Sequence, residues 1–252
     1  MSAVPDPTGP VSSGPVHRAL SVEVARAQAR GRSVPRVLDV GGGSGAWAVA
    51  LAGLGCAVTV VDNSPDALAA LHRRAREAGV HEWVTPVQGD VDALAEVAPS
   101  GGADLVLGHG LLEVVDDVAH AVRAMASAAA PGGAVSVLVA GRHAAVLSRT
   151  LAGRLTEARA LLTDAHGGWG PDDPLRRRLD AAGLRALLDG VGLGVELLQG
   201  DGVLEGWVPG VVRDGGPAAT TALAELESLA ASEPALLDVA GRLHALARRP
   251  PT

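Results

Sequence analysis

The chain reads Arg36-Val37-Leu38-Asp39-Val40-Gly41-Gly42-Gly43-Ser44-Gly45 at the point where an apolar strand runs into a glycine-rich turn. The Ala- and Leu-rich sequence that follows, to about Ala52, has the composition of a helix. Glycines in such a turn let the backbone approach a ligand closely, and the start of a helix leaves backbone N–H groups free. The stretch therefore predicts a strand, a ligand-binding turn and a helix, in that order.

Strand and helix patterns alternate along the rest of the chain. Continuous apolar runs such as Val135–Val139 are typical of strands that are buried on both faces of a sheet. Strands that alternate with helices form a parallel sheet through right-handed crossovers. We therefore expect an α/β fold with a mostly parallel, seven-stranded sheet and helices on both faces. The strands are expected at 36–40, 57–61, 83–87, 103–107, 134–140, 194–198 and 242–248, and the main helices at 16–32, 46–52, 65–78, 91–97, 115–130, 184–191 and 220–231.

The segment from His143 to Ala182 interrupts this alternation. It is helical at first, then polar and rich in Gly and Pro at Gly167–Pro174, and then carries Arg176-Arg177-Arg178. We expect a helical insertion over the sheet at about 143–182, after the fifth strand, within a single domain spanning 15–252. Residues 1–14 are rich in Pro, Ser and Gly and are expected to form a flexible tail.

The composition excludes several classes of protein. The chain has 252 residues, 48% of them hydrophobic and 19% charged, so we expect a folded domain rather than a disordered chain. It contains no lysine, which excludes a P-loop and a Schiff-base enzyme because both depend on a lysine amine. A single cysteine, Cys56, excludes an internal disulfide and is expected to be a small buried hydrophobe. The histidines lack metal-ligand spacing, so we expect no metal.

Charge and hydropathy bear on partners and location. The net charge of −7 argues against broad, non-specific binding of nucleic acid, although it leaves room for a local basic face. The sequence shows no signal peptide and no apolar run of membrane-spanning length. We expect a cytoplasmic enzyme without a membrane partner; the oligomeric state is not indicated.

Two interpretations of the glycine-rich turn compete. Gly41-x-Gly43-x-x-Ala46 satisfies a loose dinucleotide fingerprint. Asp39-x-Gly41-x-Gly43-x-Gly45, with an acid on the strand two residues before the first glycine, is similar to the S-adenosylmethionine site of class I methyltransferases. The two interpretations predict different cofactors, so the stretches after the later strands are needed to choose between them.

Those later stretches favour a methyltransferase. Each follows or precedes one strand, and their order resembles the methyltransferase motif series: Val60-Val61-Asp62-Asn63-Ser64, Val87-Gln88-Gly89-Asp90-Val91-Asp92, Gly108-His109-Gly110 and Ala130-Pro131-Gly132-Gly133. The resemblance implies a Rossmann-like methyltransferase fold and S-adenosyl-L-methionine as the cofactor.

From Arg18 to Pro250 the chain also resembles the tRNA carboxymethoxyuridine methyltransferase family and its actinobacterial relatives. The match is carried by the strand and turn at 36–43 and by His109-Gly110-Leu111-Leu112-Glu113 and Asp173-Pro174. Near the C-terminus it is carried by Leu226-Glu227, Glu233-Pro234, Arg242, His244 and Ala247-Arg248-Arg249-Pro250, a region that varies widely among methyltransferases.

The resemblance implies the contacts of the cofactor. Arg18 would pair with the methionine carboxylate, and Asp39 would face the methionine ammonium. Asp62 would accept hydrogen bonds from the ribose hydroxyls, and Asp90 would accept one from the adenine amino group. Each has a structural alternative: a solvated arginine for Arg18, helix caps for the three acids and a surface loop for His109. The expected cofactor-binding residues are Arg18, Asp39, Gly41, Gly42, Gly43, Asp62, Asn63, Gly89, Asp90, Val91 and His109.

The sequence leaves the methyl acceptor open between tRNA and a small molecule. The family substrate is a carboxylate, which is already anionic, so an enzyme of this kind needs no general base. His109, His143 and Asp172 are possible bases for a hydroxyl or amine acceptor, but no spacing distinguishes one of them, and the catalytic residue is not assigned. We expect an oxygen acceptor, on tRNA or on a small metabolite, held between His109 and the insertion.

The sequence differs from the family pattern at several positions, so other functions remain alternatives. Gly202 stands near the place of a family arginine, and Trp169 and Trp207 are the only aromatic residues near the insertion and tail that could stack on a base. A small-molecule methyltransferase of secondary metabolism and a cofactor-binding homologue without catalysis therefore remain alternatives. Binding of RNA would require one basic face, formed by Arg142, Arg149, Arg154 and Arg176–Arg178.

Overall fold

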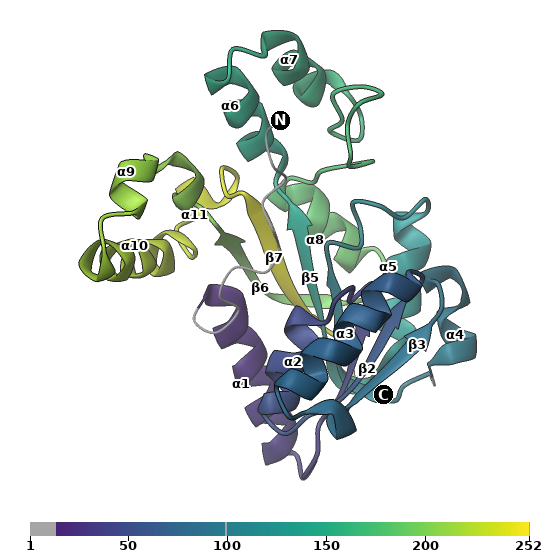
Figure 1. The fold of residues 1–252 in the computed structure, drawn as a ribbon. Helices are drawn as coiled ribbons and strands as arrows, with labels where there is room; N and C mark the ends of the chain where they lie inside the picture. The colour runs from purple at the N-terminus through teal and green to yellow at the C-terminus, as the bar shows by residue number, and fades with distance from the viewer. Residues whose placement is uncertain (1–13, 99, 252) are drawn as a thin grey trace.

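The computed structural model describes residues 14–98 and 100–251, so the expected flexible tail, apart from Gly14, lies outside the described residues. Within these ranges seven strands form one sheet in the order β3-β2-β1-β4-β5-β7-β6 (Figure 1). The strands are β1 (Arg36–Val40), β2 (Ala57–Asp62), β3 (Val84–Gln88), β4 (Ala103–His109), β5 (Ala129–Ala140), β6 (Gly194–Asp201) and β7 (Arg242–Arg248).

The sheet is mostly parallel, as predicted. Strands β1 to β5 pair in parallel, and β7 lies between β5 and β6 and runs antiparallel to both. The end of β6 and the beginning of β7 therefore lie at the same edge of the sheet as the carboxyl ends of β1 to β5. In open α/β sheets this carboxyl edge is where ligands bind.

Helices cover both faces, which confirms the predicted Rossmann-like layers. The helices α1 (Pro15–Ala29), α2 (Ala46–Gly53) and α3 (Pro65–Glu77) bury their Leu, Val and Ala side chains against one face of the sheet. The helices α4 (Leu94–Val97), α5 (Val118–Ala128) and α8 (Ala181–Asp189) cover the other face. Cys56 is buried in the first of these layers, as expected, and burial together with the charge of Asp104 raises the pKa of its thiol to about 11.

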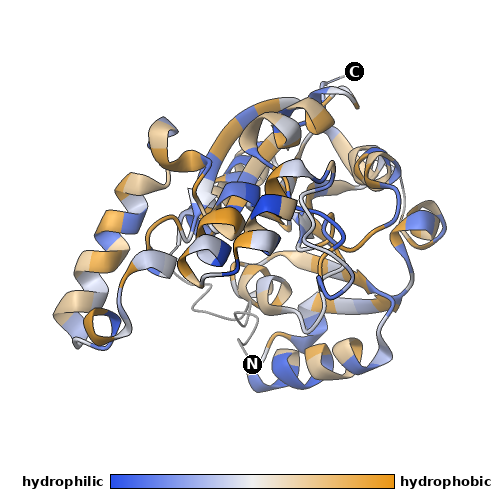
Figure 2. Cartoon of the chain, turned by 90° about the horizontal axis from the view of Figure 1, so that it is seen from above, coloured by the Kyte–Doolittle hydropathy of each residue, from blue (hydrophilic) through white to orange (hydrophobic). Residues whose placement is uncertain are grey.

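The remaining helices project from the sheet. Helices α6 (Arg142–Leu151) and α7 (Leu155–Thr163) stand above the end of β5, and α9 (Gly210–Arg213), α10 (Pro217–Ala230) and α11 (Pro234–Leu237) form an arm between β6 and β7 (Figure 1). Seen from above, both projections carry hydrophobic as well as polar residues along their length (Figure 2). Short 3₁₀ turns lie at His81–Trp83, Val91–Ala93 and Glu205–Trp207. No described helix is both long and apolar enough to cross a membrane.

The predicted helix at 115–130 is wrong at both ends. Helix α5 begins at Val118, because the Asp117 side chain accepts a hydrogen bond from the His120 N–H at 2.8 Å and caps it. It ends at Ala128, and Ala129 already pairs with Ala103 of β4. Long-range strand pairing thus begins before the Pro-Gly-Gly bend instead of after it, which local helix propensity does not reveal.

Candidate functional site

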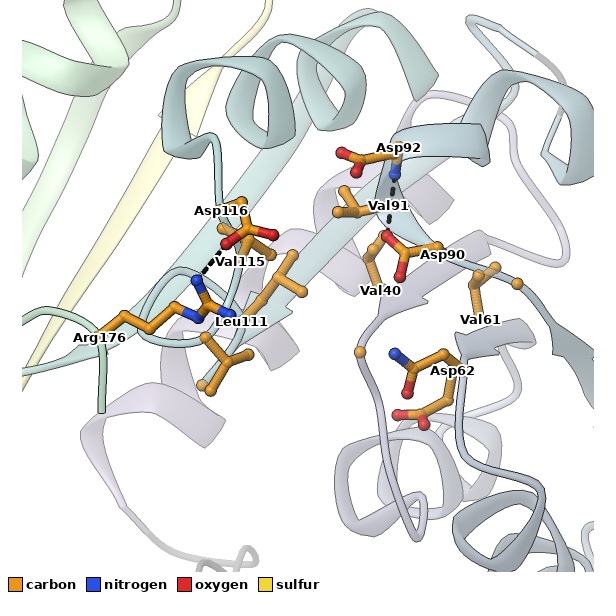
Figure 3. A pocket seen from close by; sticks show the side chains of 15 residues that line it. Val40, Val61, Asp62, Asp90, Val91, Asp92, Leu111, Val115, Asp116 and Arg176 are labelled. Carbon is orange, nitrogen blue, oxygen red and sulfur yellow. Dashed lines mark hydrogen bonds and ion pairs between the residues drawn. The ribbon is translucent and has the colours of Figure 1, made fainter. Parts of the chain in front are cut away.

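A cavity of about 350 Å³ opens at the carboxyl edge of the sheet (Figure 3). Its walls come from the ends of β1, β2 and β3, from the loop between β4 and α5, and from Arg176 of the insertion. The lining residues are Val40, Gly41, Val61, Asp62, Asn63, Gly89, Asp90, Val91, Asp92, Gly110, Leu111, Val114, Val115, Asp116 and Arg176. Six of the expected cofactor-binding residues line this cavity: Gly41, Asp62, Asn63, Gly89, Asp90 and Val91.

Asp62 connects the second strand to the glycine-rich turn. Its Oδ2 accepts a hydrogen bond from the Gly43 N–H at 2.8 Å, and its Oδ1 accepts one from the Ser64 N–H at 2.9 Å. Ser64 itself caps α3, since its Oγ accepts a hydrogen bond from the Ala67 N–H at 3.2 Å. A carboxylate has about four acceptor positions, so Asp62 can hold the turn and still accept hydrogen bonds from a ligand.

Asp39 is the buried acid beneath the same turn. Its side chain is almost fully buried, and its Oδ2 has no hydrogen-bond partner in the described part of the chain. Burial, and then the negative charge of Asp62, raise the pKa of the Asp39 carboxyl to about 7. A cationic group beside this oxygen would satisfy it and favour its charged form.

Only a glycine at position 42 lets the turn lie so close to the buried Asp39 carboxylate. A Cβ atom there would lie 2.6 Å from both Cγ and Oδ2 of Asp39 and 2.8 Å from a methyl carbon of Val60. Gly41 and Gly43 have positive φ angles of 68° and 56°, a region that favours glycine. The turn is therefore a close cradle over the buried carboxylate. Gly42 and Gly43 support the turn without lining the cavity itself.

Asp90 and Val91 form the opposite wall. The Asp90 Oδ1 accepts a hydrogen bond from the Asp92 N–H at 3.2 Å and caps the short turn that follows β3 (Figure 3). The structural role expected as an alternative is thus present, but the Asp90 side chain remains exposed and lines the cavity.

His109 ends β4 next to the cavity without lining it. Its Nε2 lies 2.8 Å from the Ser136 Oγ, while its Nδ1 is buried and has no partner among the described residues. Burial, and then the proximity of His244 and Arg242, lower the pKa of His109 well below its usual value, so the ring is neutral near pH 7. His109 is therefore part of the packed sheet edge and not a surface loop histidine.

Arg18 lies away from the cavity lining. It is exposed on α1, and its Nη2 donates a hydrogen bond to the Ser228 Oγ of α10 at 2.8 Å. The structure thus places Arg18, the arginine expected to bind the methionine carboxylate, against the projecting arm.

Sequence reasoning missed the wall that follows β4. Leu111, Val114, Val115 and Asp116 line the cavity together with Arg176, which forms an ion pair with Asp116 (Figure 3). Two features of the sequence lie in the segments that form this wall. They are the match at His109-Gly110-Leu111-Leu112-Glu113 and the arginine run of the insertion. Their meeting depends on tertiary structure.

The arginine run attaches the insertion to this wall. The Arg177 guanidinium donates to the backbone oxygens of Leu112 at 2.7 Å, Val115 at 2.5 Å and Asp116 at 3.1 Å. Arg178 is buried and forms a two-pronged ion pair with Asp173, at 2.7 and 3.0 Å. These guanidinium groups are used within the protein, since each faces a carboxylate or backbone oxygen.

Trp169 is likewise held within the insertion. The guanidinium carbons of Arg149 and Arg178 lie 3.8 and 4.1 Å from the centroid of its ring. Cation–π contacts of this kind stabilise the packing of a loop. Trp207 donates from its indole nitrogen to the Val203 oxygen at 2.9 Å and is partly buried.

The charge of the cavity indicates the kind of ligand that it suits. Asp62, Asp90, Asp92 and Asp116 line it, against one arginine that is already paired with Asp116. Such a site suits a ligand that carries positive charge together with hydroxyl and amine donors. S-adenosylmethionine, with a sulfonium, an ammonium, an adenine amino group and a ribose diol, has this chemistry. No cluster of potential metal ligands was found within residues 14–98 and 100–251.

Comparisons with known proteins identify the family of the chain. The family described as "Methyltransferase domain" matches residues 15–195. A ubiquinone biosynthesis O-methyltransferase of Xanthomonas axonopodis is 34% identical over 131 residues, which cover 52% of this chain and 54% of that protein. A relative with the same name from Paracidovorax citrulli is 38% identical over 109 residues, covering 43% of this chain and 45% of that protein. This chain therefore matches only about half the length of these curated relatives.

Solved structures give the same fold. A SAM-dependent methyltransferase from Methanosarcina mazei superposes with a TM-score of 0.61 at 14% identity, over 87% of this chain and 94% of that chain. An S-adenosylmethionine-dependent methyltransferase from Mesorhizobium loti has a TM-score of 0.57 at 21% identity, over 92% and 97% of the two chains. With the family match across most of its length, the chain belongs to the methyltransferase domain family.

Proposed function

We propose that this protein is an S-adenosylmethionine-dependent methyltransferase. It transfers the methyl group of the cofactor to an oxygen atom of a small-molecule acceptor, which is held between His109 and the insertion. The direction toward oxygen is supported by the relatives that are named ubiquinone biosynthesis O-methyltransferases. The observation that carries the choice of a small molecule over tRNA is the state of the arginines in the insertion.

Those arginines are engaged with the protein itself. Arg142 donates to the backbone oxygens of Leu161, Leu162 and Asp164, at 2.7, 3.0 and 2.6 Å. Arg149 and Arg154 both pair with Glu157. With Arg176, Arg177 and Arg178 held as described above, all six arginines that RNA binding would require on one basic face have partners within the protein. Binding of phosphates would have to displace these partners, which favours a small acceptor over an extended RNA backbone.

We also propose roles for the residues around the cofactor. Asp62 accepts hydrogen bonds from the ribose hydroxyls, and Asp90 accepts a hydrogen bond from the adenine amino group. Val91 packs against the adenine ring. Gly41 and Asn63 would help to hold the ribose, and Gly89 would let the backbone approach the adenine closely. When bound, the cofactor supplies an electrophilic methyl group, and the chain orients the acceptor toward it and excludes water.

The acceptor class is tested with S-adenosylmethionine that carries a ¹³C-labelled methyl group. The purified chain is incubated with a panel of phenols, catechols and carboxylic acids, and separately with total tRNA. The ¹³C chemical shift of the product separates O-methyl from N-methyl and S-methyl groups, and mild alkali releases methanol from an ester but not from an ether. We expect label on an oxygen of a small molecule. Label on nitrogen or sulfur, or label found only in tRNA, would contradict the proposal.

Two controls accompany this assay. The Asp62→Asn variant keeps the shape of the side chain but replaces one acceptor oxygen by a donor, and it should weaken cofactor binding by about 1–3 kcal/mol. A salt titration of tRNA binding measures whether any affinity arises from phosphate contacts, since such binding falls steeply with salt. We expect weak tRNA binding even at low salt.

A further inference from the structure

A chain of hydrogen bonds crosses four neighbouring strands and ends at the cofactor edge of the sheet. His109 Nε2 on β4 lies 2.8 Å from the Ser136 Oγ on β5, and the same Oγ lies 2.8 Å from His244 Nε2 on β7. His244 Nδ1 in turn lies 2.9 Å from Gln199 Nε2 on β6. Ser136, Gln199 and His244 are all buried, so water does not compete for these bonds.

The register of the sheet builds this chain. Leu138 of β5 pairs with His109 on one side and with His244 on the other, and Ser136 stands two residues earlier on the same face. The serine hydroxyl therefore reaches both rings. Gln199 pairs directly with His244 across the β6–β7 ladder.

The direction of the hydrogen bonds follows from the donor at the far end. An amide nitrogen only donates, so Gln199 Nε2 donates to His244 Nδ1, which accepts. Burial lowers the pKa of His244 to about 4 and that of His109 well below its usual value, so both rings are neutral and each has one N–H. His244 therefore donates from Nε2 to the serine oxygen, and the serine hydroxyl donates to His109 Nε2. The remaining hydrogen of His109 is on Nδ1.

This N–H is a buried donor without a partner among the described residues. The ring is held edge-on by Trp47, whose ring centroid lies 5.0 Å away at an interplanar angle of 86°. An unsatisfied buried donor of this kind destabilises the folded chain. A ligand atom that accepts the hydrogen bond would recover this cost.

A complementary unsatisfied group lies on the neighbouring strand. Asp39 of β1 pairs with Leu107 of β4, so His109 stands two residues further along, level with Gly41. Asp39 and His109 face the same side of the sheet, because side chains alternate along a strand and Leu107 is on that side. At the carboxyl edge of the sheet, β1 thus carries an unsatisfied acceptor, Asp39 Oδ2, and the neighbouring strand β4 carries an unsatisfied donor, His109 Nδ1–H. An amino acid in its zwitterionic form carries the matching ammonium and carboxylate.

We propose that Gln199, His244 and Ser136 are positioning residues that fix the tautomer of His109, so that its Nδ1–H donates to the carboxylate at the amino-acid end of the cofactor. The proposal rests on the proposed function in one respect, namely that the cofactor binds at this edge. It also assigns His109 a role as donor and excludes its Nδ1 as a general base, because that nitrogen already carries a proton.

Nuclear magnetic resonance of the ¹⁵N-labelled chain tests the tautomers directly. Long-range ¹H–¹⁵N spectra distinguish a protonated ring nitrogen from one with a lone pair, and loss of signals in His109→Gln and His244→Gln assigns the two rings. We expect a proton on Nδ1 of His109 and on Nε2 of His244. A proton on Nε2 of His109, or on Nδ1 of His244, would overturn the proposal.

Calorimetry then tests the effect on the ligand. Ser136→Ala removes the link between the rings, and we expect His109 to populate its other tautomer and affinity for S-adenosylhomocysteine to fall about three- to tenfold, the equivalent of one hydrogen bond. Affinity for methylthioadenosine, which lacks the amino-acid part, should be unchanged. Val137→Ala is the control, because it shortens a buried side chain of β5 on the opposite face of the sheet; it should lower stability and leave both affinities intact.

The outcomes separate the two proposals. Equal loss of affinity for both nucleosides in Ser136→Ala, or an equal loss in Val137→Ala, would contradict the positioning role. If Ser136→Ala does not fold, the tautomers of the unaltered chain still decide the direction of the hydrogen bonds. Absence of binding of either nucleoside to the unaltered chain would contradict the proposed cofactor roles, whatever the tautomers are.

Discussion

At the scale of single residues, Asp39 lies in an environment that opposes its charge. The acid is buried at the end of β1, and burial together with Asp62 raises its pKa to about 7. In the range from about pH 4 to pH 7 the folded chain therefore keeps a proton that the unfolded chain has lost. The contribution of this residue to stability is largest below its ordinary pKa of 3.8 and decreases as the pH rises to about 7.

Replacing Asp39 with Asn should remove this pH dependence. We expect Asp39→Asn to raise the free energy of unfolding at about pH 8 by about 1–4 kcal/mol, because no buried charge is then required, and to weaken cofactor binding. Urea unfolding at about pH 5 and pH 8 and calorimetry with S-adenosylmethionine measure the two effects. Asp104→Asn is the control, since Asp104 is also buried but is paired with Arg32 and with the Arg36 N–H at the opposite edge. A pH dependence in Asp39→Asn equal to that of the unaltered chain would show that Asp39 does not titrate in this range.

At the scale of elements, the turn between β1 and α2 depends on close backbone approach. A Cβ at position 42 would lie 2.6 Å from Asp39 and 2.8 Å from Val60, so Gly42→Ala should destabilise the chain by about 1–3 kcal/mol and reduce cofactor affinity. Gly53→Ala, in α2 where no atom lies within 4 Å of the added carbon, should be neutral or slightly stabilising. Thermal unfolding measures the stability of both variants, and calorimetry measures their cofactor affinity. Tight cofactor binding by Gly42→Ala would contradict the claim that the turn needs a glycine at this position.

The loop between β4 and α5 is an element that depends on the insertion for its position. Arg177 binds three backbone oxygens of this loop, which also forms a wall of the cavity. Arg177→Gln should therefore speed hydrogen–deuterium exchange at about residues 110–116 and lower cofactor affinity about two- to tenfold, the equivalent of one or more lost hydrogen bonds. Arg185→Gln, an exposed arginine on α8, is the matched control and should change neither quantity. Unchanged exchange in Arg177→Gln would mean that the loop is held by its own packing.

At the scale of the whole molecule, Arg248 links the last strand, β7, to the first helix, α1. From β7 its guanidinium donates to Glu23 of α1 at 2.9 Å and to Glu196 of β6 at 2.6 and 2.7 Å. These carboxylates raise the pKa of Arg248 further above its usual value. Glu23 is 2% exposed and forms ion pairs with Arg248 and with Arg26 of the same helix.

Removing this arginine should cost much of the stability of the domain. We expect Arg248→Met to lower the free energy of unfolding by about 3–5 kcal/mol, because it leaves a buried carboxylate short of its partner. The double variant Glu23→Gln with Arg248→Met should recover part of this loss, since the buried charge is then absent. Urea unfolding of the three chains measures the coupling, and additive losses would contradict it.

Much of this protein was predictable because its signals are local. The apolar strands and the order of the acids after them predict a mostly parallel sheet with these acids at its carboxyl edge. The positions of Asp62 and Asp90 in the cavity follow from the same rule, because parallel strands end at one edge. The bounds of α5 did not follow, because the start depends on a capping side chain and the end on pairing with β4.

The sequence by itself determined the fold class, the glycine-rich turn and two of the acids that line the cavity, Asp62 and Asp90, since each depends on residues that are close together along the chain. Only the tertiary structure decided which distant groups meet. It brought Arg177 to the loop after β4, Arg18 to Ser228, and Ser136 between two histidines that stand 135 positions apart in the numbering. These contacts depend on strand order, register and the path of the insertion, which are set by the burial of the whole sheet and not by any local pattern.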